Sequence, residues 1–581
     1  MRKVKAYSLA NVRDDDVLVC AFDTETRGLG GELLCCQARI MSESFFFSGE
    51  NFLDEFIDLL LEHPTPFIHY AHNAQYDWRY IIPRLIEREL DVQLNLRTDT
   101  DIYQVTIKHN GTKIVMRDSY ALIPSSLAKL TSAYCPELPK MDFDHENIEF
   151  DPTNPDHRAY AIRDVEALQL GIIRFGQLLK NTFGITPGHT TAGTALKAWQ
   201  KTIPDGVYHN GSKLDARELF IRQAYYGGLV FLTRNDTVRG EPGALTYDIN
   251  SSYPSVMVEF GVPSGRIFET REYQTGKMGI YRCRVRAPDD LIIPILPCRN
   301  SRGHMQWRRG EFETVVTNSE LIFAARHGYE ILEIFEGIVF EEKIFPFNDF
   351  INLCKSLRFA FPGLPQEDVA KLMQNSLYGK FGSRRERLKI FVPTCGDDYF
   401  GAMPLEGLDY FWVKSEIDEE MLCNPHWAVF ITAHARLKLL EAAYAVGPEN
   451  VLYGDTDSLT ILAGHEQSID VGKEYGQFKL EKEWTRFRAI APKVYTGTLL
   501  NGQFKGAAKG LPRKALTDAH WAELLEHGHT EAEALSLSSL RLSLSKGNNP
   551  ATRLKRKSTD IKNSSNWELT GNNVRPKIHG S

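Results

Sequence analysis

The feature of this chain that most constrains its fold is a buried strand that runs directly into two carboxylates. Residues 17–22 (VLVCAF) form a short apolar run, and Asp23 and Glu25 follow it at once. Because side chains alternate along a strand, two carboxylates separated by one residue point to the same side. A second apolar run, at 64–71, comes shortly before Asp77. Strands that lead into acidic residues predict an α/β unit with carboxylates gathered at one edge.

A helix completes this first acidic set. Residues 155–175 carry apolar side chains at three- and four-residue spacing, and Tyr160 and Asp164 share one face of the predicted helix. Each element alone is more often surface charge, but three in order favour a site. Carboxylates in one place repel each other unless divalent cations lie between them. The candidate ligands of two ions that cleave a phosphodiester bond are therefore Asp23, Glu25, Asp77 and Asp164.

A second acidic set lies in the C-terminal half. Residues 244–248 predict a strand that ends at Asp248, and 451–462 predict a hairpin with Asp455 and Asp457 in its turn. An acidic turn alone is also ordinary hairpin chemistry, because Asp suits turns. If the two strands are neighbours, Asp248 and a hairpin aspartate can bridge two Mg²⁺ ions. That arrangement suits the attack of a 3′-hydroxyl on a nucleotide α-phosphate.

A predicted helix at 366–381 supports the nucleotide interpretation. Lys371, Asn375 and Tyr378 fall at i, i+4 and i+7, so they share one face. A cation, an amide and an aromatic ring on one stripe suit a triphosphate, a sugar and a base plane.

The rest of the C-terminal half reads as two irregular stretches and two further helices. A turn-rich segment is predicted from 257 to about 345, and an irregular stretch from 383 to 426. Helices are predicted at 427–444 and 518–545.

Charge and composition narrow the class of protein. The net charge of −7 does not by itself indicate DNA binding, but phosphate contacts can line a single groove. Basic residues gather at 505–514 (KGAAKGLPRK), which suits a duplex backbone, and in the tail at 546–581, which is more typical of a solvated end. Nine cysteines are scattered without any CxxC pair, which argues against zinc and against a disulfide framework. No apolar run approaches a membrane span of ~18 residues, so we expect a cytoplasmic protein without a membrane partner.

The motifs together resemble those of family B DNA polymerases, in the family's order. Three look like exonuclease motifs: DTE at 23–25, NxxYD at 73–77 and YxxxD at 160–164. Three look like polymerase motifs: DxNSxYP at 248–254, KLMQNSLYGK at 371–380 and YGDTDS at 453–458. YYGG at 225–228 looks like the motif that links the two activities, and KVY at 493–495 looks like the one that holds the primer end.

The resemblance implies an α/β and α+β multidomain fold. A ribonuclease-H-like 3′–5′ exonuclease domain is followed by a right-hand polymerase with palm, fingers and thumb. The short length and the room for two insertions resemble the protein-primed subgroup of small linear-genome phages and linear plasmids. The implied boundaries are 1–186 for the exonuclease, 187–259 and 427–517 for the palm, 260–342 for a first insertion that contacts a terminal protein, 343–382 for the fingers, 383–426 for a second insertion that serves strand displacement and processivity, and 518–581 for the thumb and basic tail.

The resemblance also assigns roles in synthesis. Asp248, Asp457 and the Ile249 carbonyl would bind metal, with Asp455 in support. Tyr253 would stack under the sugar and exclude ribonucleotides, Lys371 would neutralise the triphosphate, and Asn375 and Tyr378 would shape the nucleotide pocket. Lys355 and Arg358 are further phosphate candidates.

In the exonuclease site the resemblance makes Asp23, Glu25, Asp77 and Asp164 metal ligands and Tyr160 the group that orients the water. The implied DNA contacts are Asn73, Ser119, Lys140, Tyr225, Gly227, Gly228, Lys493 and Tyr495. The subgroup's serine–leucine pair is Ser119-Tyr120 in this chain, a departure at that position.

The implied activity is template-directed DNA synthesis with 3′–5′ proofreading. The implied cofactor is Mg²⁺, two ions per site, with Mn²⁺ as an alternative. The implied partners are template and primer DNA, dNTPs and a terminal protein, with the chain a monomer or a heterodimer with that protein.

Three other hypotheses compete with this interpretation. A stand-alone exonuclease with a structural C-terminal half is disfavoured by the intact 371–380 helix and the DTD turn. A non-catalytic replication scaffold is disfavoured because both carboxylate sets are complete. Within the polymerase interpretation, a nucleic-acid-primed enzyme is the alternative to protein priming.

Overall fold

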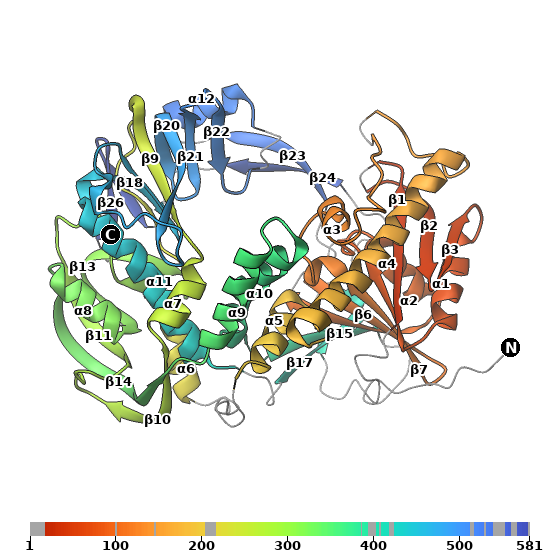
Figure 1. Ribbon diagram of the computed structural model, residues 1–581, viewed down its shortest axis with the longest axis horizontal. Helices are drawn as coiled ribbons and strands as arrows, with labels where there is room; N and C mark the ends of the chain where they lie inside the picture. The colour runs from red at the N-terminus through yellow and green to blue at the C-terminus, as the bar shows by residue number, and fades with distance from the viewer. Residues whose placement is uncertain are drawn as a thin grey trace.

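The computed structural model describes residues 18–28, 30–98, 101–144, 147–203, 216–384, 386–392, 403–405, 408–417, 423–511, 516–527, 530–537, 552–558 and 566–578. Figure 1 shows an N-terminal sheet with its helices on the right and two further large sheets on the left. Two helices, α9 (Asn348–Ala360) and α10 (Pro365–Phe381), lie between these parts. The described chain is thus mixed α/β and multidomain, as predicted.

The N-terminal sheet is built on the strand that carries the first carboxylates. β1 (Leu18–Thr26) pairs in parallel with β4 (Phe67–Ala71), which pairs in parallel with β7 (Thr112–Asp118). On its other side β1 pairs antiparallel with β2 (Leu33–Ile40), followed by β3 (Glu43–Ser48). The predicted strands at 17–22 and 64–71 are confirmed, and β1 continues through Asp23 and Glu25.

Helices cover this sheet and fix its acidic edge. α4 (Pro155–Phe183) contacts β1 and β2, and it confirms the predicted helix at 155–175. It starts at an Asn154 cap and ends at Gly184, whose φ of 65° is the left-handed conformation typical of a helix C-terminus. The other helices of this part are α1 (Phe52–Glu62), α2 (Trp78–Glu87) and α3 (Leu127–Tyr134).

The expected irregular stretch at 383–426 contains strands that extend the N-terminal sheet. β15 (Glu386–Val392) pairs antiparallel with β5 (Asp91–Thr98), and β17 (Leu408–Ile417) pairs with β15. β16 (Met403–Leu405) forms the edge beyond them, and β6 (Asp101–His109) joins β5 to β7. The prediction was wrong because β15 and β17 are separated by a stretch rich in Gly, Asp and Pro, and because β15 pairs with β5, which is distant in sequence.

The expected turn-rich segment at 257–345 is largely a second sheet. Its strands are β10 (Val262–Thr270), β11 (Gly279–Ala287), β12 (Pro297–Arg299), β13 (Met305–Thr317) and β14 (Glu330–Ile344), with α8 (Asn318–Arg326) following β13. The prolines that suggested turns fall where strands tolerate them. Pro263 lies near the start of the edge strand β10, Pro288 lies just after β11, and Pro297 begins β12.

The third sheet carries the second acidic set. Its order is β22-β21-β20-β9-β19-β18-β8, and all neighbouring strands in it are antiparallel. The strands at the acidic set are β9 (Val238–Ile249), β18 (Val451–Asp455) and β19 (Ser458–Leu462), which confirm the predicted strand and hairpin. The others are β8 (Val230–Leu232), β20 (Phe478–Ala491), β21 (Val494–Leu499) and β22 (Phe504–Ala508).

Helices back the third sheet and join it to the rest. α11 (Pro425–Val446) confirms the helix predicted at 427–444, and it contacts α7 (Ser252–Glu259), α6 (Ala216–Gln223) and α10. α10 confirms the helix predicted at 366–381, and it also contacts α5 (Thr191–Gln200). α10 also contacts α7, the helix that follows β9 and its Asp248 in the chain.

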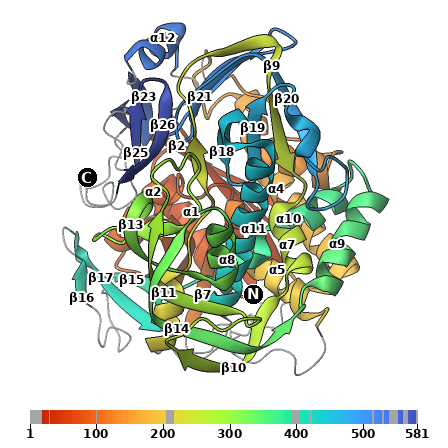
Figure 2. The ribbon, with the colours of Figure 1, turned by 90° about the vertical axis from the view of Figure 1, so that its left-hand side faces the viewer.

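The C-terminal region differs from the long helix predicted at 518–545. α12 (Asp518–His527) ends where Gly528 follows in the sequence, and glycine disfavours a continuing helix. β23 (Glu531–Leu537) then pairs with β24 (Thr552–Ser558). The hairpin of β25 (Trp567–Thr570) and β26 (Asn573–Ile578) joins the second sheet through β13 (Figure 2). The tail at 546–581 therefore includes strands in its described parts.

Two further findings concern the cysteines and the helices of the described ranges. The eight cysteines in the described ranges are all buried, and none of them forms a disulfide. No helix in the described part of the chain is long and apolar enough to cross a membrane.

Candidate active sites

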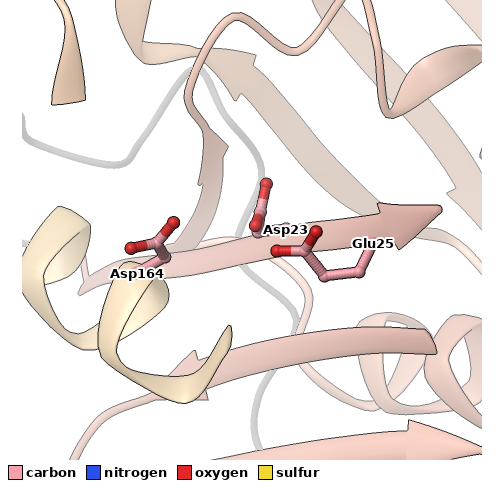
Figure 3. A group of neighbouring side chains, drawn as sticks. All are labelled: Asp23, Glu25 and Asp164. Atoms are coloured by element: carbon pink, nitrogen blue, oxygen red, sulfur yellow. The ribbon is translucent and has the colours of Figure 1, made fainter. Parts of the chain in front are cut away.

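The first site is a cluster of three carboxylates between β1 and α4. Asp23, Glu25 and Asp164 each offer an oxygen, and these oxygens lie within 4.8 Å of one another. Figure 3 shows Asp23 and Glu25 on one strand and Asp164 turned toward them from the helix. The alternation of side chains along β1, together with the position of Asp164 on α4, therefore brings together three of the four predicted ligands.

Burial makes this cluster costly without a cation. Burial, reinforced by the Asp164 charge, raises the pKa of Asp23 to about 7. The pKa of Glu25 is also well above its usual range, because of burial and then the charges of Asp23 and Asp164. Buried carboxylate oxygens close together are the donor set that hard divalent cations prefer. The residues present therefore fit the metal that the sequence predicted.

Asp77, the fourth predicted ligand, lies beside this cluster rather than within it. It is 2% exposed, and its carboxylate accepts a hydrogen bond of 2.7 Å from the Thr24 hydroxyl. Burial and then the Asp23 charge raise its pKa. Asp77 therefore contributes charge next to the three clustered carboxylates, and its role as a ligand stays a prediction.

Two predicted residues, Tyr160 and Lys140, sit on the cluster. The Lys140 ammonium donates to the Tyr160 hydroxyl at 3.1 Å and forms an ion pair with Asp164. The Tyr160 ring packs against Phe143, with ring centroids 4.9 Å apart. Tyr160 is thus placed to orient a group at the carboxylates, while Lys140, predicted as a DNA contact, lies against the acidic residues themselves.

The neighbouring Ser119 differs from its predicted role as a DNA contact. Its side chain is fully buried, and its hydroxyl donates to the Ala71 carbonyl at 3.0 Å. The exposed member of the pair is Tyr120, at 41%. A direct contact between DNA and the Ser119 hydroxyl conflicts with this burial.

Asn73 has a left-handed φ of 61°, and its backbone N–H donates to Asp118 at 3.0 Å.

The second site forms where β9 meets the hairpin. Ser458 lies opposite Asp248, and the Ile249 N–H donates to the Asp457 carbonyl at 2.8 Å. Asp248 and Asp457 line an open cavity of about 500 Å³. The cavity brings together six residues predicted for metal or nucleotide binding: Asp248, Ile249, Tyr253, Lys371, Asn375 and Asp457.

The electrostatics of this cavity combine acidic and basic groups. Burial and then the charges of Asp248 and Asp455 raise the pKa of Asp457 to about 6. Burial also raises the pKa of Asp248, and Lys479, whose ammonium lies 3.3 Å from its carboxylate, opposes that rise. Such a pair of carboxylates fits divalent cations, and the lysines and arginine on the same walls fit phosphate.

Tyr253 and Tyr378 form one side of the nucleotide region. Tyr253 comes from α7 and Tyr378 from α10, and their rings stack with centroids 4.1 Å apart and planes at 14°. Tyr253 was predicted to stack under the sugar and Tyr378 to shape the nucleotide pocket, and both roles stay predictions. Their contact joins the helix after β9 to the helix that carries Lys371.

Asp455 and the predicted primer-end residues form a separate group. Asp455, Asp457, Lys493 and Tyr495 line a neighbouring cavity of about 420 Å³. The Lys493 ammonium lies 3.0 Å from an Asp455 oxygen, and the Lys493 N–H donates to the Tyr453 hydroxyl at 2.9 Å. Asp455 therefore links the acidic turn to the KVY segment, and its supporting role at the metal stays a prediction.

The YYGG segment packs directly against the acidic turn. A Cβ on Gly228 would lie 2.7 Å from the Thr456 hydroxyl, and the Thr456 N–H donates to the Leu229 carbonyl at 2.8 Å. The Tyr225 ring lies against Gly382 at the end of α10. These contacts give Tyr225 and Gly228 a packing role beside the site. Their DNA contacts, like that of Gly227, stay predictions.

Sequence analysis missed several residues of the second site. Lys473, Tyr475 and Lys479 line the cavity together with Arg358, which was predicted. Lys479 lies opposite Asp248 in the pairing of β20 with β9, so a predicted register would have found it. Lys355, also predicted for phosphate, forms an ion pair with Glu474 instead. Buried Arg436 was missed as well; it donates to the Tyr226 and Gly227 carbonyls and pairs with Glu320 at 2.6 Å.

Comparison with known proteins identifies similar sequences and folds. A family model described as "DNA polymerase type B, organellar and viral" matches residues 63–157 and 153–399. The DNA polymerase of Bacillus phage Nf is 25% identical, with 79% of this chain and 83% of that protein covered. A probable DNA polymerase of Neurospora intermedia is 24% identical over 80% of this chain, but the match spans only 55% of that protein's length.

A solved structure shares the fold over nearly the whole chain. It is the phi29 DNA polymerase complexed with primer-template DNA and incoming nucleotide substrates, with a TM-score of 0.73 and 20% identity. The match covers 94% of this chain and 99% of the other. This likeness confirms the predicted polymerase fold.

Proposed function

The chain belongs to the organellar and viral type B DNA polymerases, and from that premise we propose that it is a template-directed DNA polymerase with a 3′–5′ exonuclease. The observation that carries the proposal is the cavity where Asp248 and Asp457 face Lys371 and Asn375. Carboxylates and phosphate-binding cations that line one cavity suit a nucleoside triphosphate held at a metal centre. The cluster at Asp23 carries the second activity.

In synthesis, each residue of the cavity has a distinct task. Asp248, Asp457 and the Ile249 carbonyl would hold Mg²⁺, which supplies positive charge for the attacking and leaving oxygens. Lys371 and Arg358 would neutralise the triphosphate as pyrophosphate departs. Tyr253, stacked on Tyr378, would lie under the sugar and exclude a 2′-hydroxyl.

In degradation, the three clustered carboxylates would bind the cations, with Asp77 beside them. The Tyr160 hydroxyl, which accepts a hydrogen bond from Lys140, would orient the attacking water. The Lys140 ammonium would then stabilise negative charge that develops on the phosphate. Mn²⁺ is expected to substitute for Mg²⁺ at both sites, since carboxylate oxygens suit either ion.

The priming partner is the finer part of the proposal. The second sheet, which includes most of the predicted first insertion at 260–342, would contact a terminal protein whose hydroxyl receives the first dNMP. The strands of 383–426 would border the DNA and support strand displacement. Support for this comes from the motif order and from the similarity to a phage polymerase. The protein would act in the cytoplasm of the cell that holds the linear genome.

One experiment tests synthesis and priming together. Purified protein receives Mg²⁺ and labelled dNTPs, with either a primed template or the candidate terminal protein on its origin end. Label in the extended primer supports the polymerase, and label bound covalently to the terminal protein supports protein priming. Extension without labelled protein would favour a nucleic-acid primer. No extension by folded protein would overturn the proposed polymerase.

A further inference from the structure

A tyrosine from the palm reaches between the two helices that carry the phosphate-binding cations. Tyr475 lies just before β20, and it lines the cavity that also contains Arg358 and Lys371. Arg358 belongs to α9 and Lys371 to α10. Tyr475 is thus a palm residue in contact with the predicted fingers, outside every motif that the sequence singled out.

The Tyr475 hydroxyl closes a network of four side chains. It donates to the Gln374 carbonyl oxygen at 2.8 Å and accepts from the Arg358 guanidinium at 3.0 Å. The same Arg358 nitrogen lies 2.7 Å from the Ser251 hydroxyl, and the Gln374 amide donates to that hydroxyl at 3.2 Å. Gln374 is fully buried, so its amide depends on these partners.

The Tyr475 ring and the adjacent Glu474 also attract two cations of α9. The Arg358 guanidinium carbon lies 5.5 Å from the Tyr475 ring centroid, and the Lys355 ammonium lies 5.4 Å from it. Lys355 also forms an ion pair with the adjacent Glu474. Both contacts are within the range of cation–π attraction. One short palm segment therefore fixes two cations of α9, and through Gln374 it also fixes α10.

This geometry matters because Arg358 is long and flexible. A guanidinium offers donors in a fixed planar fork, so its value for phosphate depends on its orientation. Ser251 and Tyr475 together hold one nitrogen of the fork. Without the tyrosine hydroxyl, that nitrogen keeps only the serine, and the buried Gln374 oxygen loses a donor.

We propose that Tyr475 is a positioning residue for the incoming nucleotide. Its hydroxyl orients the Arg358 guanidinium toward the triphosphate, and it ties α9 and α10 to the palm in the nucleotide-binding arrangement. The proposal rests on the proposed polymerase function, since the triphosphate is the substrate of that activity. It assigns to Tyr475 an effect on nucleotide affinity that passes through Arg358.

The test compares Tyr475→Phe with the unchanged full-length protein in single-nucleotide primer extension with Mg²⁺. The substitution removes one oxygen and keeps the ring. KM for the dNTP is expected to rise on the order of tenfold, as for loss of a hydrogen bond to a charged group. The value of kcat is expected to change much less. Exonuclease activity reports on folding, because that site lies elsewhere, and it should be unchanged.

A matched control and a second background separate positioning from stability. Tyr444→Phe also removes a tyrosine hydroxyl, which donates to the Ile293 carbonyl at 2.7 Å. Neither residue lines the cavity, so this variant should leave KM unchanged. In the Arg358→Ala background, Tyr475→Phe should cause no further rise in KM.

Each outcome decides a different point. An unchanged KM for Tyr475→Phe, or an equal rise in the Arg358→Ala background, would overturn the positioning role and leave the polymerase intact. Absence of nucleotide incorporation by the unchanged protein would overturn the proposed function, and the positioning role with it.

Discussion

In the N-terminal part, oxygens of three carboxylates from one strand and one helix lie within 4.8 Å of one another, whereas at the third sheet Asp248 and Asp457 line an open cavity. Each place also has a lysine against an acidic residue: Lys140 on Asp164, and Lys479 on Asp248. The enclosed cluster is complete within its own domain. Asp248 and Asp457 share their cavity with residues from α9 and α10. The chemistry of the first site therefore suits metal ions, and that of the second suits metal ions together with a large anionic substrate.

The largest effect is expected from variants that disrupt only the cluster of Asp23, Glu25 and Asp164. Asp23→Ala combined with Glu25→Ala removes two of the three clustered carboxylates, so degradation of a single-stranded 3′ end should fall by on the order of 10³-fold or more. Extension of a primed template should continue. Gel analysis of a labelled oligonucleotide measures both. Persistent 3′ trimming by the double variant would refute the exonuclease assignment.

The next largest effect comes from a change at Gly228, which packs against the turn that carries Asp457. In Gly228→Ala the new Cβ would lie 2.7 Å from the Thr456 hydroxyl, and Thr456 is a β-branched residue between two aspartates. The turn must shift, and a small misplacement of reacting groups costs about 10²-fold. We expect synthesis to fall by about that factor while degradation is unchanged.

Gly227→Ala provides the contrast for that variant. A Cβ at this position meets nothing within 4 Å, so the acidic turn should stay in place and synthesis should fall much less. Equal losses in the two variants, measured by primer extension, would contradict the packing role of Gly228.

These packing contacts show where prediction from sequence ends. The strand before Asp23, the face of α10 and the hairpin at Asp457 were predictable because local periodicity and turn chemistry determine them. Lys479 and Tyr475 were not, because their roles depend on the register of β20 and on helices distant in sequence. The long strands β13 and β14 each contain an interior glycine, Gly310 and Gly337, which weakens the strand pattern in the sequence. β15 joins the N-terminal sheet by pairing with distant β5.

The pH dependence should also separate the two sites. A carboxylate binds a metal ion in its deprotonated form, so proton uptake at low pH competes with metal binding. The pKa of Asp23 is about 7, and that of Asp457 is about 6. At limiting Mg²⁺, degradation should therefore be lost at a higher pH than synthesis. Rates of both reactions between about pH 5 and 8.5 check this order. Earlier loss of synthesis would contradict it.

The smallest expected effect is on stability. The pKa of Asp23 is raised to about 7 in the folded protein, so its charged form destabilises the metal-free fold. This destabilisation is complete above pH 7, and it fades as the pH falls toward about 4, the usual pKa of an aspartate. Asp23→Asn should raise the melting temperature of EDTA-treated protein at pH 8 by about a few degrees, with the gain fading near pH 4. Asp290→Asn, at an exposed position, is the control. A gain that grows as pH falls would contradict the assigned burial effect.

The central claim is that two independent metal sites perform opposite reactions on the same DNA end. The most direct measurement uses Asp457→Asn with a labelled, primed template and Mg²⁺, and follows extension with dNTPs and degradation without them. The account predicts loss of extension with degradation at the rate of the unchanged protein. Loss of both reactions in a folded variant, or continued extension, would contradict separate sites.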